Sequence, residues 1–138
     1  PETPEFPPPG SGLWLVLTLA VSLGIVVVSL FPFNFAAGRP PMLAFYAPAW
    51  AMIGLQVALF APLGVVEGEL ARRVLGGWRA GSWGAVLIGL DAGLLALICE
   101  TLQYWLPGRL SSSLDILAAA VGAIAGYMIS TLVRGHPE

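Results

Sequence analysis

The sequence predicts an all-α membrane protein, a bundle of four transmembrane helices in one domain. Of its 138 residues, 57% are hydrophobic and only 10% are charged, whereas an ordinary soluble domain carries about 25% charged residues. Four apolar stretches are each long enough to cross a hydrocarbon core of about 30 Å as a helix. Helices are expected rather than strands, because the stretches do not alternate with period two and because a helix satisfies its own backbone hydrogen bonds in lipid.

Prolines mark several boundaries of these stretches. Pro32 ends the first stretch, because proline cannot continue a helix. Pro48 opens the second stretch, since proline is favoured in the first turn, and Pro107 with Gly108 stops the third. The predicted elements are a Pro-rich cytoplasmic tail at 1–12, a transmembrane domain at 13–133 with helices at about 13–31, 48–66, 82–105 and 114–133, and a C-terminal tail at 134–138.

The distribution of arginines predicts the orientation of the bundle. Four arginines lie on the side that holds both termini, and two lie on the other side. Because positive residues are enriched in cytoplasmic loops, we expect both termini and the middle connection in the cytoplasm. The first set is Arg72, Arg73, Arg79 and Arg134, and the second is Arg39 and Arg109.

Small residues indicate how the helices pack. Gly89 and Gly93 form a G-x-x-x-G pair in the third stretch, and Gly122 and Gly126 form another in the fourth. Such pairs let helix backbones approach closely in a membrane. Since only a short connection joins these two stretches, we expect them to form a tight helical hairpin.

Polar residues gather around that connection. Glu100 and Gln103 share one helix face, because they are three residues apart, and Asp115 lies in a first turn, where the macrodipole favours a carboxylate. Arg109 stands between them, and Ser111, Ser112 or Ser113 is expected to cap the fourth helix. Two interpretations stay open: Arg109 pairs with a carboxylate and locks the hairpin, or these groups form a polar pocket for a headgroup or for acid–base chemistry.

Two other groups of polar residues need an explanation. Asp91 lies about 180° around the helix from Glu100, so we expect it outside the hairpin cluster, with a partner such as Gln56 on the second stretch or a Ser or Thr on the first. An ionisable group at this depth is costly, and a structural hydrogen bond is the favoured role. Glu67 and Glu69, beside Arg72 and Arg73, are interpreted as a solvated interfacial cluster.

Several classes of site are excluded by what the sequence lacks. Cys99 is the only cysteine, which rules out an internal disulfide and a cysteine metal cluster, and we expect it to be a small core residue. The sequence contains no metal-ligand spacing, no Gly-rich phosphate loop and no Ser–His pair. We therefore expect no metal and no cofactor, and the absence of a basic field argues against nucleic acid as a partner.

Three motifs resemble the VanZ-like family of small bacterial membrane proteins. The first is LFPFNF at 30–35. The second is QVALFAPLG at 56–64, and the third runs from Glu100-Thr-Leu-Gln103 through Pro107-Gly108-Arg109, Ser112 and Asp115-Ile-Leu to Gly122-Ala and Gly126. The resemblance implies a multi-helix protein of the bacterial inner membrane. The founding member is associated with low-level resistance to the glycopeptide teicoplanin.

The sequence departs from the family pattern at two amide positions. Gln56 and Ala119 stand where the family usually has Asn. The loss of the second amide removes a polar group one turn from Asp115, which favours a structural role for this region.

Three functions are compatible with these residues. The first is a non-catalytic envelope protein whose outward pocket of Glu100, Gln103, Arg109, Ser112 and Asp115 binds a lipid headgroup or a glycopeptide-type amphiphile. The second is an accessory subunit of a respiratory or photosynthetic membrane complex. The third is a membrane enzyme with Glu100 and Asp115 as acid and base, which ranks last because no nucleophile is visible. Membrane lipids are the expected partners, and other membrane subunits are an alternative.

Overall fold

The protein is described by a computed structural model that covers residues 10–36, 50–75, 82–106 and 111–134. Within these ranges the chain forms four helices: α1 (Ser11–Leu30), α2 (Trp50–Leu75), α3 (Ser82–Gln103) and α4 (Ser113–Arg134). Each helix is long and apolar enough to cross a membrane. The predicted all-helical architecture with four membrane-spanning segments is therefore confirmed.

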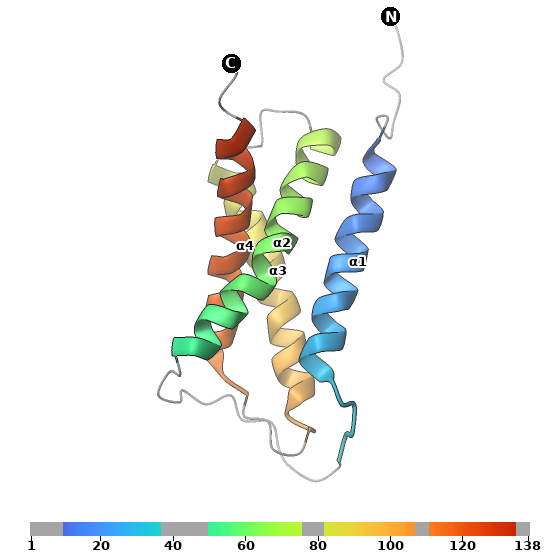
Figure 1. The fold of residues 1–138 in the computed structure, drawn as a ribbon, viewed down its shortest axis with the longest axis vertical. Helices are drawn as coiled ribbons and strands as arrows, with labels where there is room; N and C mark the ends of the chain where they lie inside the picture. The colour runs from blue at the N-terminus through green and yellow to red at the C-terminus, as the bar shows by residue number, and fades with distance from the viewer. Residues whose placement is uncertain (1–9, 37–49, 76–81, 107–110, 135–138) are drawn as a thin grey trace, which may run out of the picture.

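Successive helices run in alternate directions, so two ends of the bundle can be distinguished (Figure 1). The start of α1, the start of α3 and the ends of α2 and α4 lie at one end, which we call the terminal end. The ends of α1 and α3 and the starts of α2 and α4 lie at the other, which we call the hairpin end. This arrangement places the two sets of polar residues found below at opposite membrane interfaces.

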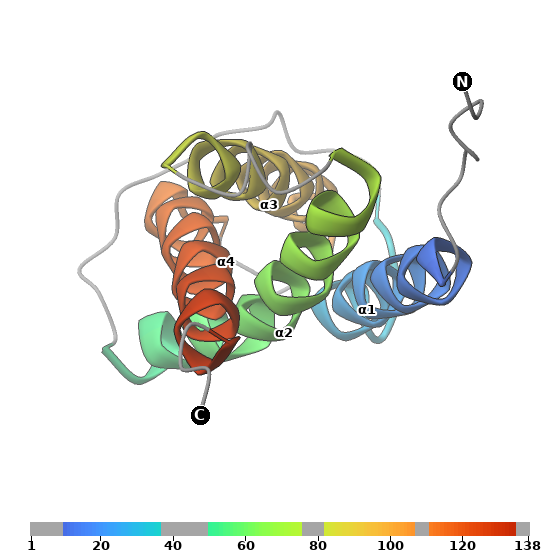
Figure 2. The same cartoon turned by 90° about the horizontal axis from the view of Figure 1, so that it is seen from above.

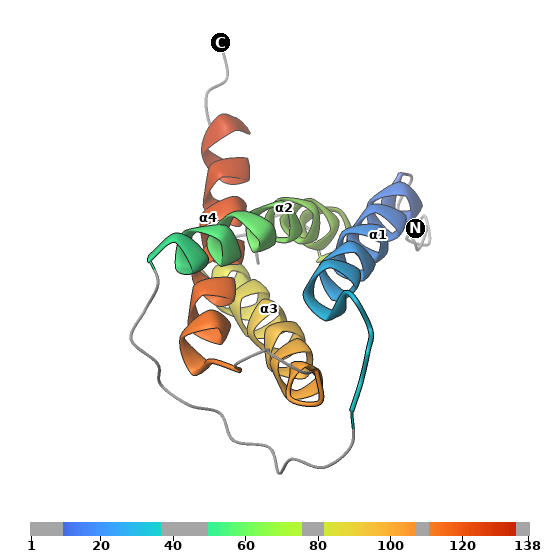
Figure 3. The same cartoon turned by 60° about the horizontal axis from the view of Figure 1, so that its bottom comes forward.

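The closest packing joins α2 and α4. These two helices run in the same direction, and their axes cross at an angle (Figures 2 and 3). Gly122 and Gly126 lie against the backbone of Val57 and Ala61, and Gly64 lies against the backbone of Ala123. A Cβ atom at any of these glycines would overlap the facing backbone. Because only glycine permits such an approach, these positions fix where the two helices cross.

The predicted hairpin of α3 and α4 is also present, and the glycines of α3 lie at its interface. Gly89 lies close to the side chain of Ile124, and Gly93 lies next to Ala120. Gly122 and Gly126 do not contribute to this hairpin, because both face α2. On α2 they lie against Val57 and Ala61, whereas Gly64 of α2 lies against Ala123 of α4.

The second helix is longer than expected. It continues past Val66 to Leu75, and it contains Pro62 near its middle, where α2 bends in Figure 1. A proline inside a helix removes one backbone hydrogen bond and commonly bends it. The extension beyond Val66 is stabilised by ion pairs from Glu69 to Arg72 and Arg73, three and four residues along the same helix.

The core is formed where α2, α3 and α4 meet, and α1 packs on its edge. Phe60 and Leu63 of α2 are fully buried, together with Ala92, Ala119 and Ala123 of α3 and α4. The most apolar stretch of α1 is only 17% buried, compared with 28–33% for the other three helices. The exposed apolar faces are those that lipid would cover.

Candidate functional site at the hairpin end

Glu100 is the centre of the polar cluster at the hairpin end. Its side chain is only 2% exposed, and its Oε2 atom accepts a 2.8 Å hydrogen bond from the backbone amide of Ser112. The hydroxyl of Ser111 donates a 2.6 Å hydrogen bond to the Glu100 carbonyl. These bonds fasten the end of α3 to the start of α4, and we call them the lock. The lock predicted from the sequence, a pairing of Arg109 with a carboxylate, is a different contact.

Gln103 extends the lock to the first helix. Its Nε2 atom donates a 3.1 Å hydrogen bond to the carbonyl of Ser29, and both residues are buried. One turn earlier on α3, the Cys99 thiol is hydrogen-bonded to Ser29. Cys99 is 2% exposed, so the prediction of a buried core cysteine is confirmed.

The segment after α1 reaches the same region. The backbone amide of Ala36 donates a 2.7 Å hydrogen bond to the carbonyl of Trp105. The motif at 30–35 therefore ends next to the motif that begins at Glu100. Chain segments far apart in the sequence, from α1, α3 and α4, meet at the hairpin end.

The remaining predicted members of this cluster lie around the start of α4. The Ser112 hydroxyl accepts a 3.2 Å hydrogen bond from the Leu114 amide, so Ser112 caps the helix. Asp115 is half-buried in the first turn. Arg109 lies outside the described residues, between Leu106 and Ser111, and its predicted pairing with a carboxylate stays a prediction.

Asp91 has a partner on α2 that the sequence did not indicate. Its carboxyl group is hydrogen-bonded to that of Glu67, and the second oxygen of Glu67, Oε2, is buried with no hydrogen-bond partner among the described residues. Gln56, half-buried on the same helix, lies eleven residues before Glu67, or about 16 Å along the helix. Both acids line a cavity of about 720 Å³ between α1, α2 and α3, with mostly apolar walls. The prediction that Glu67 belongs to a solvated cluster is wrong, because its side chain faces α3.

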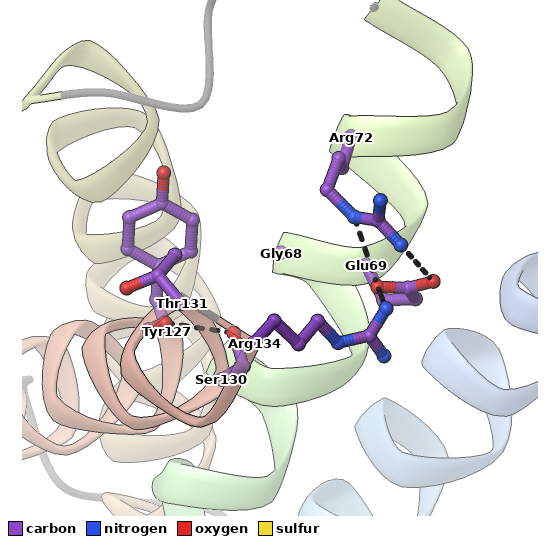
Figure 4. A pocket seen from close by; sticks show the side chains of 7 residues that line it. All are labelled: Gly68, Glu69, Arg72, Tyr127, Ser130, Thr131 and Arg134. Carbon is purple, nitrogen blue, oxygen red and sulfur yellow. Dashed lines mark hydrogen bonds and ion pairs between the residues drawn. The ribbon is translucent and has the colours of Figure 1, made fainter. Parts of the chain in front are cut away.

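Glu69 is the centre of a second polar cluster, at the terminal end. Its side chain is 5% exposed and forms ion pairs with Arg72 and Arg73 at 2.8 Å and with Arg134 of α4 at 2.9 Å. We call these four residues the arginine cluster (Figure 4, which draws Glu69, Arg72 and Arg134). Glu69 was expected to be solvated, and this is also wrong, because three guanidinium groups cover it.

The contribution of Arg134 could not be found from local sequence. Arg72 and Arg73 are at helical spacing from Glu69 and were grouped with it, whereas Arg134 is distant in the chain. A signal did exist in the G-x-x-x-G pairs of α2 and α4, Gly64 with Gly68 and Gly122 with Gly126. These pairs indicate that α2 and α4 can pack closely. Since alternate spans run in the same direction, the last turns of the two helices, where Glu69 and Arg134 lie, are then at the same end of the bundle.

A comparison with protein-family models matches residues 11–134 to the family described as VanZ/LLP1. Comparisons with curated proteins and with solved structures give no match. The family match includes all four helices and both polar clusters. The chain therefore belongs to the VanZ/LLP1 family of proteins.

Proposed function

We propose that this multi-pass membrane protein is a non-catalytic component of the bacterial inner membrane that binds the headgroup of an amphiphile at the hairpin end. The observation that carries the proposal is the buried bond network of Glu100, Ser111 and Ser112, with Gln103 bonded to Ser29. It holds three chain segments in one arrangement at a membrane interface. A rigid frame of this kind preorganises the groups around it for binding.

In this proposal the buried residues hold the site, and their neighbours meet the ligand. Asp115 is half-buried in the first turn of α4. Arg109 belongs to the connection of four residues between Leu106 and Ser111 in the sequence. Its planar guanidinium group suits a phosphate or a carboxylate, and Asp115 suits a hydroxyl or an amine of the same headgroup. A lipid and a lipoglycopeptide such as teicoplanin both carry these groups.

The test compares two arginine variants of the purified full-length protein. Arg109→Ala is expected to weaken binding of phosphatidylglycerol or teicoplanin about ten- to a hundredfold, since one charge-assisted contact contributes roughly 1.5–3 kcal/mol. Arg39→Ala, which removes the same charge from the segment between α1 and α2, is the matched control. Unchanged affinity of a folded Arg109→Ala variant for both ligands would reject the proposal.

The proposed orientation has the hairpin end outside and both termini in the cytoplasm. The arginine cluster supports it, because Arg72, Arg73 and Arg134 all lie at the terminal end and positive residues favour the cytoplasmic side. Alkaline phosphatase fused after residue 138 is expected to be inactive, and a cytoplasmic fluorescent reporter at the same place to be active. The reverse pattern would contradict the orientation.

A second candidate function is that of an accessory subunit in a larger membrane complex. The observation that favours it is the low burial of α1, only 17% over its most apolar stretch, which leaves a helix face for a partner as well as for lipid. Purification in a mild detergent tests this directly. A particle with the mass of one chain and its detergent, without co-purifying proteins, would argue against a subunit role.

A further inference from the structure

The arginine cluster carries more positive charge than its carboxylate neutralises. Arg72, Arg73 and Arg134 all pair with Glu69, which leaves two positive charges uncompensated within the cluster. Their side chains are 34–49% exposed, whereas Glu69 is 5% exposed. The buried acid therefore lies beneath a positively charged surface.

Hydrogen-bond capacity shows the same excess. Three guanidinium groups offer about fifteen N–H donors, whereas one carboxylate accepts about four hydrogen bonds. Arg72 uses Nε and Nη2 towards Glu69, Arg73 uses Nε, and Arg134 reaches it with Nη1. The N–H donors that Glu69 does not use can bind an additional acceptor with several oxygens.

A cavity of about 300 Å³ adjoins these donors between α2 and α4. Figure 4 shows Arg134 extending across it from α4 towards Glu69, with Arg72 on the opposite wall. The volume corresponds to about ten water molecules at roughly 30 Å³ each, which is enough for a phosphate group and a small part of a headgroup. Gly68 lets the Tyr127 ring pack directly against α2 at one wall, because a Cβ atom there would lie 2.6 Å from Cδ2 of Tyr127.

The rest of the wall suits hydroxyl groups. The hydroxyl of Ser130 donates to the Tyr127 carbonyl at 2.7 Å, and that of Thr131 donates to the Met128 carbonyl at 2.7 Å. Each hydroxyl oxygen can still accept a hydrogen bond. The cavity thus combines donors for an oxyanion with acceptors for an alcohol.

The arginine cluster lies at the depth expected for lipid headgroups. It lies in the last turns of α2 and α4, where these membrane-spanning helices end. Arg73 also lies 5.6 Å from the ring centre of Trp14, a cation–π contact, and tryptophan is typical of the membrane interface. Anionic lipids of the cytoplasmic leaflet attract basic residues at this depth.

We propose that the cavity walled by Arg72, Arg134, Ser130 and Thr131 binds a phosphate group, delivered by an anionic phospholipid headgroup or free in solution. Arg72 and Arg134 contact the phosphate oxygens. Glu69 is a positioning residue, because it holds the guanidinium groups from two helices in one orientation. This site is at the opposite end of the bundle from the headgroup site proposed above, and it does not depend on that site.

The experiment measures how ligands raise the thermal unfolding midpoint of the full chain in mixed micelles. The probes are dioleoyl-phosphatidylglycerol, dioleoylglycerol with the same acyl chains but no phosphate, and inorganic phosphate. Native mass spectrometry gives the affinity for the phospholipid. Arg72→Gln and Arg134→Gln are compared with Arg39→Gln, which removes the same charge elsewhere in the chain.

Phosphatidylglycerol is expected to raise the midpoint more than dioleoylglycerol does. Each cluster variant is expected to bind the phospholipid about tenfold more weakly, about 1.4 kcal/mol, and Arg39→Gln to bind it like the wild type. If the headgroup is the source, inorganic phosphate has little effect. If free phosphate is the source, it raises the midpoint by itself, and phosphatidylglycerol gives no shift that depends on Arg72 or Arg134.

The ligand-dependent shift separates binding from a purely structural role. A structural cluster would lower the midpoint of Arg134→Gln equally with and without phosphatidylglycerol, whereas a binding site loses the shift itself. Should the Arg72→Gln variant fail to fold, Arg134→Gln, whose side chain is 49% exposed in the last turn of α4, provides the same readout. The proposal is overturned if neither phosphate source gives a shift that depends on these arginines.

Discussion

The backbone amide of Ser112 donates a 2.8 Å hydrogen bond to Oε2 of Glu100, so a buried carboxylate on α3 fixes the start of α4. The backbone carbonyl of Glu100 also accepts a hydrogen bond from the Ser111 hydroxyl. Glu100 thus holds the α3–α4 hairpin through both its side chain and its main chain, and its replacement provides the most direct test of this lock.

Glu100→Ala is expected to lower the free energy of unfolding by about 1–2 kcal/mol, because it leaves the half-buried Ser112 amide without its acceptor. Glu100→Gln is expected to lower it less, since its amide oxygen still accepts. Unfolding in a denaturing detergent, followed by circular dichroism, gives both values. Thr101→Ala is the control, because the Thr101 hydroxyl bonds only to the Leu97 carbonyl of its own helix among the described residues. Equal stability of Glu100→Ala and Thr101→Ala would contradict the lock.

Gly126→Ala is expected to separate α2 from α4, because a methyl group at this position overlaps the Ala61 carbonyl. Overpacking of this kind costs about 1–3 kcal/mol. Gly54→Ala is the matched control on α2, since no atom lies within 4 Å of a Cβ there, and alanine is the better helix former. The same unfolding assay is expected to rank Gly126→Ala below the wild type and Gly54→Ala at or above it. The opposite order would show that the two helices do not cross at these glycines.

Gln103→Leu is expected to loosen the contact between α1 and α3 at the hairpin end, since it removes the hydrogen bond to the Ser29 carbonyl. The single native cysteine, Cys99, reports on this contact because it is 2% exposed and bonded to Ser29. If the hydrogen bond contributes about 1 kcal/mol to closing this contact, its loss raises the population in which Cys99 is accessible about fivefold. The rate of maleimide labelling rises by the same factor. Thr18→Ala, which changes a hydroxyl bonded within α1, is expected to leave the rate unchanged. Equal rates in all three proteins would refute the prediction.

Asp91→Asn is expected to retain the stability of the wild type. A hydrogen bond between two carboxyl groups requires a proton on one of them, because a carboxylate can only accept. The amide of asparagine donates to Glu67 without that requirement, whereas Asp91→Ala removes the partner and is expected to cost about 1–2 kcal/mol. Thermal unfolding of the two variants distinguishes them. If Asp91→Asn is as unstable as Asp91→Ala, the contact with Glu67 is not a hydrogen bond of this kind.

Much of the fold could be predicted because it depends on properties that sequence displays directly. Length and hydropathy predict four spans, and prolines such as Pro32 mark where a helix stops. The end of α2 could not be predicted at Leu75, because charged residues after Val66 suggest an interface while ion pairs from Glu69 continue the helix. Hydropathy indicates which residues prefer lipid, so it predicts where the membrane span ends. It does not predict where the helix ends, because ion pairs at helical spacing can continue a helix into water.

The polar clusters were predictable only in part. Glu100 and Ser112 belong to neighbouring elements, so their proximity follows from the short connection between α3 and α4. Glu67 with Asp91 and Glu69 with Arg134 come together only when it is known which faces of the helices meet. In a helix that is apolar on most sides, hydropathy does not indicate which face meets which neighbour.

The parallel crossing of α2 and α4 has a consequence for how the protein is made. The glycine face of α2, with Gly64 and Gly68, meets a partner that is synthesised only after α3, which crosses the bilayer in the opposite direction. Until then this face is covered by lipid alone, and Glu69 lacks one of its three arginines. A chain that stops after α3 therefore leaves this face of α2 without its helix partner, and the addition of α4 both covers the face and supplies Arg134 to Glu69.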